Sequence, residues 1–373
     1  MDITANVKRD LRPRRATIRS RVHLRVPGRT GNLCDLFKGG QEGGRYTKAM
    51  NVSPTRFDSR SPVRMIAIDI DGTLMPSTGV VMSRRNQEAL RRAEAAGIEI
   101  VIATGRRHAY AMPLLRQAML RPETVIISSN GTVTRTFSGE SIDRWLLPSG
   151  TARELCGLLR QFGGTTVFTF DRGGDHELVI ESLHQLHERI AAWVDANRAY
   201  LTEVVPLERA FDGGESPVQG MVCGTVSEMR LAEERLLASK FAGLVEMHRT
   251  EYAHRNLSIL DILPPGVSKG TALERLAARR GVRTEEIVAI GDNYNDETML
   301  EHAGRGVLMG NAPEELLNLA PEKDWHVTGT NDEDGVALAI EAILHSAAVA
   351  AKQKPPVPQE VFQEIPVPMV EWP

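Results

Sequence analysis

Short apolar segments alternate with helical patterns in two separate stretches of the chain, and this alternation restricts the fold more than any other feature of the sequence. Strands are expected over residues 65–70, 98–103, 125–128, 287–290 and 307–309, and helices over 83–96, 268–280, 296–302 and 332–345. Strands that alternate with helices build a parallel sheet covered by helices. We therefore predict an α/β fold with a Rossmann-like parallel-sheet core.

The segment between these two stretches has a different order of elements. Over 148–263 the pattern reads helix, strand, strand, helix, strand, helix, strand, strand. This order is typical of an α+β domain built on an antiparallel sheet. We predict that residues 148–263 form a separate domain, inserted into a core made of residues 61–147 and 264–347.

The two ends of the chain differ from the rest in composition. Residues 1–60 carry 14 Lys and Arg against 5 Asp and Glu, whereas the other residues carry 31 against 43. Such a basic stretch can bind nucleic acid or target a protein to an organelle. A disordered extension, or a start assigned too early with Met50 or Met65 as the true start, is the expectation here, and nucleic-acid binding is not expected. Six prolines within 351–373 predict a tail over 348–373.

Composition excludes several classes of protein. The chain is 25% charged and 42% hydrophobic, which is typical of a globular protein. No apolar run approaches the roughly 18–20 residues of a membrane-spanning helix, so no membrane partner is expected. The three cysteines, Cys34, Cys156 and Cys223, are far apart and form no CxxC pair. They indicate a reducing compartment, and we expect a cytoplasmic location, with an organelle-targeting role of the basic N-terminus left open.

Polar residues gather directly after four of the predicted strands. They are Asp69 to Thr73, Thr104 to Arg106, Ser129 to Gly131 and Gly291 to Asp296. Ligands of open α/β sheets bind outside the carboxyl ends of the strands, so these clusters should converge on one site. Acidic residues at several such ends suit Mg²⁺, which takes oxygen ligands and usually shares a phosphate group with its substrate.

The same site should hold phosphate oxygens. The groups expected to do so are the Thr104 hydroxyl, the Gly105 backbone N–H, the Asn295 amide and the Lys269 ammonium. Lys269 falls in the first turn of a predicted helix, where a cation opposes the helix dipole by about 0.3–1 kcal/mol. A residue that opposes a local structural preference without an evident gain in stability is often a functional residue.

A competing motif surrounds Ser268. Residues 266–270 match G-x-S-x-G between a strand and a helix, the context of a nucleophile elbow in serine hydrolases. Pro264 and Pro265 interrupt the connection that an elbow requires, and the elbow leaves Asp69 and Asp71 without a role. We interpret Ser268 as a helix N-cap.

Seven motifs together resemble the haloacid dehalogenase (HAD) superfamily, and more narrowly its Cof-type sugar-phosphatase branch. They are DIDGTL at 69–74, ATGR at 103–106, SNG at 129–131, SKG around Lys269, GDNYND at 291–296, MGNAPEEL at 309–316 and TNDEDGVA at 330–337. The resemblance covers about residues 63–345 and leaves out both ends. It implies that the inserted segment is a cap domain that meets the leaving group of the substrate.

The resemblance also implies a role for each residue of the site. Asp69 would be the nucleophile that forms an aspartyl-phosphate, and Asp71 the general acid and then the general base. Mg²⁺ would be bound by the Asp69 carboxylate, the Asp71 backbone carbonyl and Asp292. Phosphate would be held by the Ile70 backbone N–H, Thr104, Gly105, Lys269 and Asn295, with Asp296 orienting Lys269 or the waters of the metal.

These inferences predict a Mg²⁺-dependent phosphomonoesterase that acts on a small phosphorylated metabolite, with sugar phosphate as the first candidate. Three alternatives stay open: a phosphohexomutase of the same superfamily, a serine hydrolase that uses Ser268, and a non-enzymatic sensor of a phosphorylated ligand. The sequence names neither the substrate nor the oligomeric state.

Overall fold

The computed structural model describes residues 61–353, except 163–164, 173–175, 184–189 and 253–254. The predictions for the basic N-terminal stretch, for Cys34 and for residues 354–373 of the tail lie outside the described residues. Residues 348–353, predicted as the start of the tail, instead continue the last helix. The described part of the chain contains two sheets, one of eight strands and one of six.

The eight-stranded core sheet runs in the order β14-β13-β12-β1-β2-β3-β4-β5. Its strands are β1 (Met65–Ile68), β2 (Glu99–Ala103), β3 (Val125–Ser128), β4 (Val133–Thr136), β5 (Ser141–Arg144), β12 (Ile287–Gly291), β13 (Arg305–Leu308) and β14 (His326–Val327). The strands from β14 to β3 are parallel. The sequence predicts this for all of them except the two-residue strand β14, which was not predicted. The antiparallel hairpin β4–β5 at one edge was not predicted, because both strands are short and carry charged residues.

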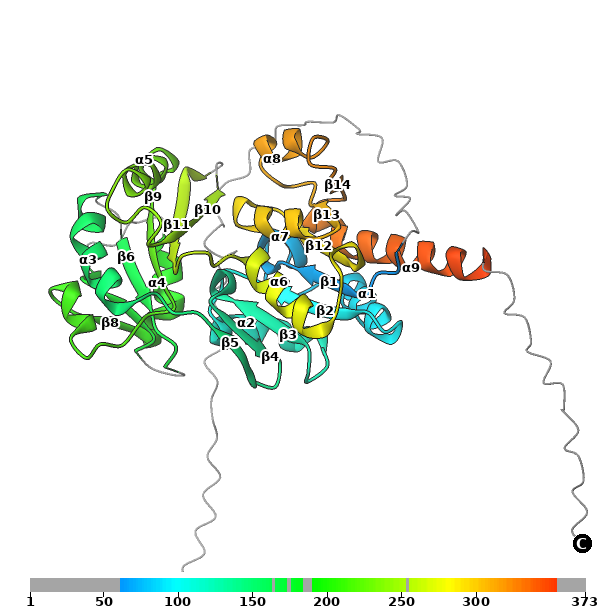
Figure 1. Ribbon diagram of the computed structural model, residues 1–373, viewed down its shortest axis with the longest axis horizontal. Helices are drawn as coiled ribbons and strands as arrows, with labels where there is room; N and C mark the ends of the chain where they lie inside the picture. The colour runs from blue at the N-terminus through cyan, green and yellow to red at the C-terminus, as the bar shows by residue number, and fades with distance from the viewer. Residues whose placement is uncertain (1–60, 163–164, 173–175, 184–189, 253–254, 354–373) are drawn as a thin grey trace, which may run out of the picture. The chain divides into compact units, whose positions relative to one another are not determined.

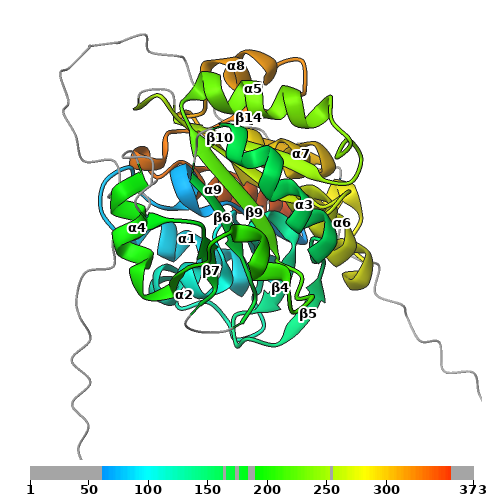
Figure 2. The same ribbon diagram turned by 90° about the vertical axis from the view of Figure 1, so that its left-hand side faces the viewer.

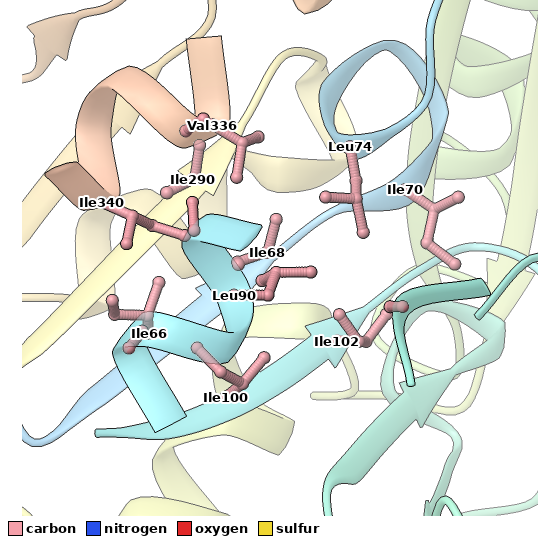
Figure 3. Packing of buried hydrophobic residues seen from close by; sticks show 14 of the residues in the cluster. Ile66, Ile68, Ile70, Leu74, Leu90, Ile100, Ile102, Ile290, Val336 and Ile340 are labelled. Atoms are coloured by element: carbon pink, nitrogen blue, oxygen red, sulfur yellow. The ribbon is translucent and has the colours of Figure 1, made fainter. Parts of the chain in front are cut away.

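Helices cover both faces of this sheet (Figure 1). They are α1 (Arg84–Ala95), α2 (His108–Leu115), α6 (Lys269–Arg280), α7 (Glu297–His302), α8 (Glu314–Leu319) and α9 (Gly335–Gln353). Alternate residues of β1 point to opposite faces. Ile66 and Ile68 pack in one cluster with residues of α1 and α9, as Figure 3 shows, whereas Met65 and Ala67 pack in another with residues of α6 and α7. A strand buried on both faces is apolar throughout, which explains the MIAI segment.

All four predicted helices begin later in the structure than expected. Those expected from Ser83 and Ser268 begin one residue later, because each serine is the N-cap. The last helix was expected from Asp332 but begins at Gly335, because Asp334 has a φ of 60°, which interrupts the helical conformation. The helix expected from Asp296 begins at Glu297, and the Asp296 carboxylate instead accepts backbone N–H groups of the preceding loop.

The six-stranded sheet, called here the cap sheet, lies between β5 and β12 in the sequence and runs in the order β10-β11-β9-β6-β7-β8. Its strands are β6 (Thr165–Thr169), β7 (Leu178–Ile180), β8 (Leu201–Glu203), β9 (Gln219–Gly224), β10 (Glu246–Tyr252) and β11 (Leu257–Leu263). Its helices are α3 (Ser149–Leu159), α4 (Ala191–Asn197) and α5 (Val226–Leu237). Most of its strand pairs are antiparallel, and the three-residue strand β8 was not predicted.

Helices α3 and α5 pack on one face of the cap sheet (Figure 2), through a cluster that includes Leu155, Phe168 and Met229. The alternate residues of the same strands, such as Val167 and Met221, face away from this cluster and line a cavity. The predicted fold class, a parallel-sheet core with an inserted α+β cap, is therefore confirmed. The exact boundaries at 147–148 and 263–264 stay a prediction. No described helix is long and apolar enough to cross a membrane.

Candidate active site

Asp69 follows β1 directly, at the carboxyl end of the central strand of the core sheet. Its backbone N–H donates to the Ile290 carbonyl over 3.0 Å, so the sheet ladder fixes its position, and the residue is only 5% exposed. The chain then turns sharply at Gly72, which has a φ of 78°. A Cβ atom there would lie 2.3 Å from Oδ2 of Asp292, so only glycine lets the two loops approach this closely.

Lys269 is fully buried and bridges two carboxylates. Its Nζ donates to Oδ1 of Asp69 and to Oδ1 of Asp296, both over 2.7 Å. Burial by itself would lower the pKa of Lys269, but Asp296 and Asp69 offset this and raise it, so the side chain stays charged. The position of Lys269 in the first turn of α6, unfavourable for the helix dipole, therefore brings a cation to the loop that begins at Asp69.

Asp69, Asp292 and Asp296 form an acidic cluster in which one oxygen of each lies within 4.8 Å of the others. Oδ2 of Asp296 accepts the backbone N–H groups of Asp292 and Asn293 over 2.9 and 3.0 Å, and Thr73 donates its hydroxyl to Oδ1 of Asp292 over 2.8 Å. Burial raises the pKa of Asp69 to about 7, and burial together with the charge of Asp296 raises the pKa of Asp292 well above 3.8. The protein places three carboxylates against one ammonium group here.

Asp71 lies on the other side of the same loop and is held by Arg106. Arg106 donates from Nε to Oδ2 of Asp71 over 2.6 Å and from Nη2 to Oδ1 over 2.5 Å, and its guanidinium stacks 4.6 Å from the centre of the Tyr110 ring. Arg106 is part of the ATGR motif, but the sequence alone predicted no role for it. A loop position beside a catalytic candidate was the only available signal.

A chain of amide and carboxyl groups links the core to the cap. Asn295 donates to Oδ1 of Asn130 over 3.1 Å, and Asn130 donates to Oδ2 of Asp261, on β11 of the cap sheet, over 2.8 Å. Gln219, on β9, donates to the other oxygen of Asp261 over 3.3 Å. Burial raises the pKa of Asp261 to about 7.

A cavity of about 110 Å³ lies between these groups and the cap sheet. Among the residues predicted for the site, Asp69, Asp71, Gly105 and Asn295 line it. The cap side is mostly apolar and aromatic, with Val167, Leu178, Ile190, Trp193, Met221, Tyr252, Leu257 and Ile259, and Gln219 and Asp261 are among its polar groups. A second cavity of about 650 Å³ shares Asp71, Tyr252 and Asn293 with the first and is also lined by Asp292.

Other predicted residues lie behind the cavity wall. The Thr104 hydroxyl accepts the backbone N–H of Arg106 over 3.1 Å, and the residue is fully buried. The Ile70 side chain packs in the core beside Ile68. The Ser268 side chain accepts the backbone N–H of Thr271 over 3.0 Å and caps α6, which agrees with its interpretation as an N-cap.

The cap residues of the site, Gln219 and Asp261 among them, were missed by the sequence analysis. Both are polar residues in otherwise apolar strands, which is a weak signal by itself. Arg107 was also missed. It pairs with Glu177 next to the cap sheet, donates to Asn197 of α4 over 3.2 Å, and thus connects the loop after β2 to the cap.

Comparison with known proteins points to one family. A family profile described as haloacid dehalogenase-like hydrolase matches residues 66–340. Phosphatase YwpJ of Bacillus subtilis (strain 168) is 31% identical over 307 residues, covering 76% of this chain and 100% of that protein. From the same organism, 5-amino-6-(5-phospho-D-ribitylamino)uracil phosphatase YwtE is 31% identical over 299 residues, covering 76% and 98%.

Solved structures give the same result for the fold. A haloacid dehalogenase-like hydrolase from Bacteroides thetaiotaomicron is 29% identical with a TM-score of 0.60, and the match covers 75% of this chain and 99% of that one. A sugar phosphatase of HAD subclass IIB is 26% identical with a TM-score of 0.61, covering 75% and 98%.

Proposed function

The chain belongs to the haloacid dehalogenase-like hydrolases and is a phosphatase, and we propose that it is a Mg²⁺-dependent phosphomonoesterase that works through an aspartyl-phosphate on Asp69. The observation that carries this proposal is the fully buried Lys269, which holds Asp69 and Asp296 at 2.7 Å each. A buried ammonium between two carboxylates at the strand ends suits an anionic substrate, and in a phosphatase it would neutralise phosphoryl oxygens.

The charges of the site fit a divalent cation. Asp69, Asp292 and Asp296 are buried together with Lys269, which leaves an excess of two negative charges. Burying unpaired charge is costly, and the raised pKa values of Asp69 and Asp292 express that cost. Hard oxygen donors suit Mg²⁺. Asp69, the Asp71 backbone carbonyl and Asp292 would hold the ion, whereas both oxygens of Asp296 are already engaged by N–H groups, which suits a positioning role.

When bound, Mg²⁺ would neutralise the carboxylates and help to offset the charge of the phosphate. The residues of the chain would then carry out transfer in two steps. A carboxylate oxygen of Asp69 attacks phosphorus, the bond from phosphorus to the ester oxygen breaks, and Asp71 gives its proton to the departing alcohol. Lys269, the Gly105 and Ile70 N–H groups and the Asn295 amide stabilise the oxygens of the transferring group.

The second step returns the enzyme to its first state. Asp71, now ionised, accepts a proton from water while the water oxygen attacks phosphorus. The bond between phosphorus and the Asp69 oxygen breaks, which releases inorganic phosphate and restores the Asp69 carboxylate. Asp71 regains its proton for the next turnover. In this scheme Thr104 acts by shaping the loop that presents Gly105, because its hydroxyl accepts the N–H of Arg106.

The substrate we propose is a small phosphorylated metabolite of the sugar-phosphate class. One relative is named for a phosphorylated ribityl compound and one structural neighbour is named a sugar phosphatase. The cavity that adjoins Asp69 and Asp71 has room for a small leaving group, and the second cavity that shares Asp71 gives further space.

A phosphate-release screen tests the proposal. The full-length protein is assayed on sugar phosphates, nucleotides, flavin mononucleotide, pyridoxal phosphate and p-nitrophenyl phosphate, in Mg²⁺ and in EDTA. We expect release in Mg²⁺, loss in EDTA, and no release by Asp69→Asn, whose amide cannot attack phosphorus. The matched control is Asp195→Asn, at a cap residue whose side chain is 69% exposed. Undiminished activity in chelator would contradict the metal requirement.

The same screen separates the alternatives. A phosphohexomutase would release an isomerised sugar phosphate rather than inorganic phosphate. A serine hydrolase would lose activity in Ser268→Ala and keep it in Asp69→Asn. This outcome is disfavoured, because the Ser268 hydroxyl already accepts the Thr271 N–H at the start of helix α6. A sensor would bind phosphorylated ligands without turnover.

A further inference from the structure

Gln219 is a buried polar residue of the cavity wall whose side chain is only partly hydrogen-bonded. Its side chain lies on β9 of the cap sheet, is 6% exposed and lines the cavity that contains Asp69 and Asp71. The Oε1 atom is buried and accepts no hydrogen bond from the described residues. Buried polar atoms in folded proteins nearly always have a partner, so an oxygen left without one at a cavity wall indicates a partner that enters the cavity.

The orientation of the Gln219 amide is fixed by a neighbour. Its Nε2 donates to Oδ1 of Asp261 over 3.3 Å, and Asp261 in turn accepts from Asn130 over 2.8 Å. When Asp261 is ionised, turning the amide over would bring Oε1 against the Asp261 oxygen, where two acceptors repel each other. Above about pH 7, where Asp261 is ionised, it therefore holds Oε1 away from itself and leaves it as an acceptor.

The cavity wall around Gln219 combines polar and apolar groups. Thr169, the register partner of Gln219 on β6, is polar and lines the same cavity. Met221 and Ile259 share the cavity-facing side of the cap sheet with Gln219, and Val167 pairs with Met221 in the register of β6 and β9. A ligand that brings a hydrogen-bond donor to this acceptor binds more tightly. A ligand that covers the acceptor with carbon binds more weakly, because the oxygen then stays without a partner.

From these contacts we propose that Gln219, held by Asp261, is a specificity-determining residue that accepts a hydrogen bond from a hydroxyl or N–H group of the leaving alcohol. The preferred substrates are phosphomonoesters whose leaving group carries such a donor, as polyol and sugar phosphates do, over esters of plain alcohols or phenols. The inference rests on the proposed phosphomonoesterase function and adds the feature of the substrate that the cap recognises.

The first test compares substrates on the unaltered full-length protein in Mg²⁺. kcat/KM is measured for ribose 5-phosphate, glucose 6-phosphate, fructose 6-phosphate and glycerol 1-phosphate, and for butyl phosphate and phenyl phosphate, which have no donor on the leaving group. Singly deoxygenated forms of the best sugar phosphate are then assayed. We expect at least one deoxygenation to lower kcat/KM by about tenfold or more. Values equal within threefold across the deoxy series, or preference for phenyl phosphate, would overturn the proposal.

The second test uses Gln219→Leu, which has similar bulk and no acceptor. The quantity measured is the ratio of kcat/KM for the best sugar phosphate to that for phenyl phosphate, and we expect it to fall by about tenfold or more. Gln161→Leu, at an exposed glutamine of the cap segment, is the matched control and should leave the ratio unchanged. A parallel fall on both substrates would assign Gln219 a structural role and contradict the proposal.

The deoxy series keeps the proposal testable if Gln219→Leu does not fold, because it needs no variant. The results also distinguish a failure of the specificity proposal from a failure of the proposed function. If the protein releases phosphate from phenyl phosphate but shows no preference for donors, the specificity proposal fails and the phosphomonoesterase stands. If no ester is hydrolysed in Mg²⁺, the proposed function itself fails.

Discussion

The Arg106 guanidinium donates two hydrogen bonds to the Asp71 carboxylate, one to each oxygen, at 2.6 and 2.5 Å. The Arg106 side chain is almost fully buried, and both residues line the cavity next to Asp69. A bidentate pair of this kind fixes the plane of the carboxyl group as well as its position. Arg106 therefore sets where the proposed acid and base of the reaction stands.

This relationship predicts a dependence on the leaving group. Asp71→Asn removes the proton donor, so it should slow the cleavage of alkyl phosphates more than that of p-nitrophenyl phosphate, whose leaving group needs no proton. We expect the two losses in kcat/KM to differ by about 10²-fold, the lower end of a general acid contribution. Arg106→Met should show the same pattern to a smaller degree. Equal losses on both substrates would show that neither residue serves proton transfer.

A second consequence concerns the intermediate. Asp71→Asn also lacks the base that activates water, so the aspartyl-phosphate should accumulate on Asp69. With p-nitrophenyl phosphate, rapid mixing should give a burst of p-nitrophenolate close to one equivalent per active site, followed by a slow steady rate. The exposed cap variant Asp212→Asn, whose side chain is 55% exposed, should behave like the unaltered protein. A linear time course in Asp71→Asn would place the loss in the first step alone.

Lys269 should contribute to stability as well as to activity. Lys269→Met leaves Asp69 and Asp296 buried without their cation, and breaking a buried pair in this way costs about 3–5 kcal/mol. Lys323→Met removes an ion pair with Glu301 whose side chains are 36% and 46% exposed, and should cost less than about 1 kcal/mol. Urea unfolding of both variants, in EDTA and in Mg²⁺, measures the difference. Similar stabilities of the two variants in EDTA would refute this account of the buried network.

Mg²⁺ should stabilise the folded protein in the absence of substrate. A cation that binds only the folded state raises the free energy of unfolding by about 2.7 kcal/mol at 100 times its Kd. We therefore expect the Tm to rise when Mg²⁺ replaces EDTA, and Asp292→Asn to reduce this rise because it removes one proposed ligand. Asp195→Asn should keep the full rise. A Tm that does not respond to Mg²⁺ in the unaltered protein would argue against a metal site at the acidic cluster.

Much of the fold could be predicted because the core strands and helix starts have distinctive local sequence patterns. Strands buried on both faces are uniformly apolar, and β1 and β2 therefore stand out in the sequence. Ser83 and Ser268 mark helix starts through side chains that accept backbone N–H groups of Asn86 and Thr271. The hairpin β4–β5 and strand β8 could not be predicted, because strands of three or four residues with charged side chains have no distinctive pattern.

The candidate site was predictable where polar residues follow strand ends, and most clearly where a residue conflicts with local preference. Asp69 at the end of an apolar strand and Lys269 in a first helical turn both violate local rules, and the structure joins them by a hydrogen bond of 2.7 Å. Arg106 and Asp261 follow ordinary patterns for a loop and a strand. Their roles depend on contacts across 35 residues, to Asp71, and across 131 residues, to Asn130, which no local pattern encodes.

Asp261 gives a prediction that depends on pH and not on catalysis. Burial raises its pKa from 3.8 to about 7, so between these values the folded protein holds a proton that the unfolded chain has released. Stability then falls as the pH rises, by about 1.4 kcal/mol per pH unit, and is constant again about one unit above pH 7.

Asp261→Asn has no proton to lose. Its free energy of unfolding relative to the unaltered protein should therefore rise by about 4 kcal/mol between pH 3 and pH 8, given a shift of about three units. Urea unfolding at several pH values measures this difference, with Asp212→Asn as the exposed control that should show no trend. A difference that stays constant from pH 4 to pH 8 would mean that Asp261 ionises normally in the folded protein, and the cavity wall around Gln219 would then be better hydrated than its apolar neighbours indicate.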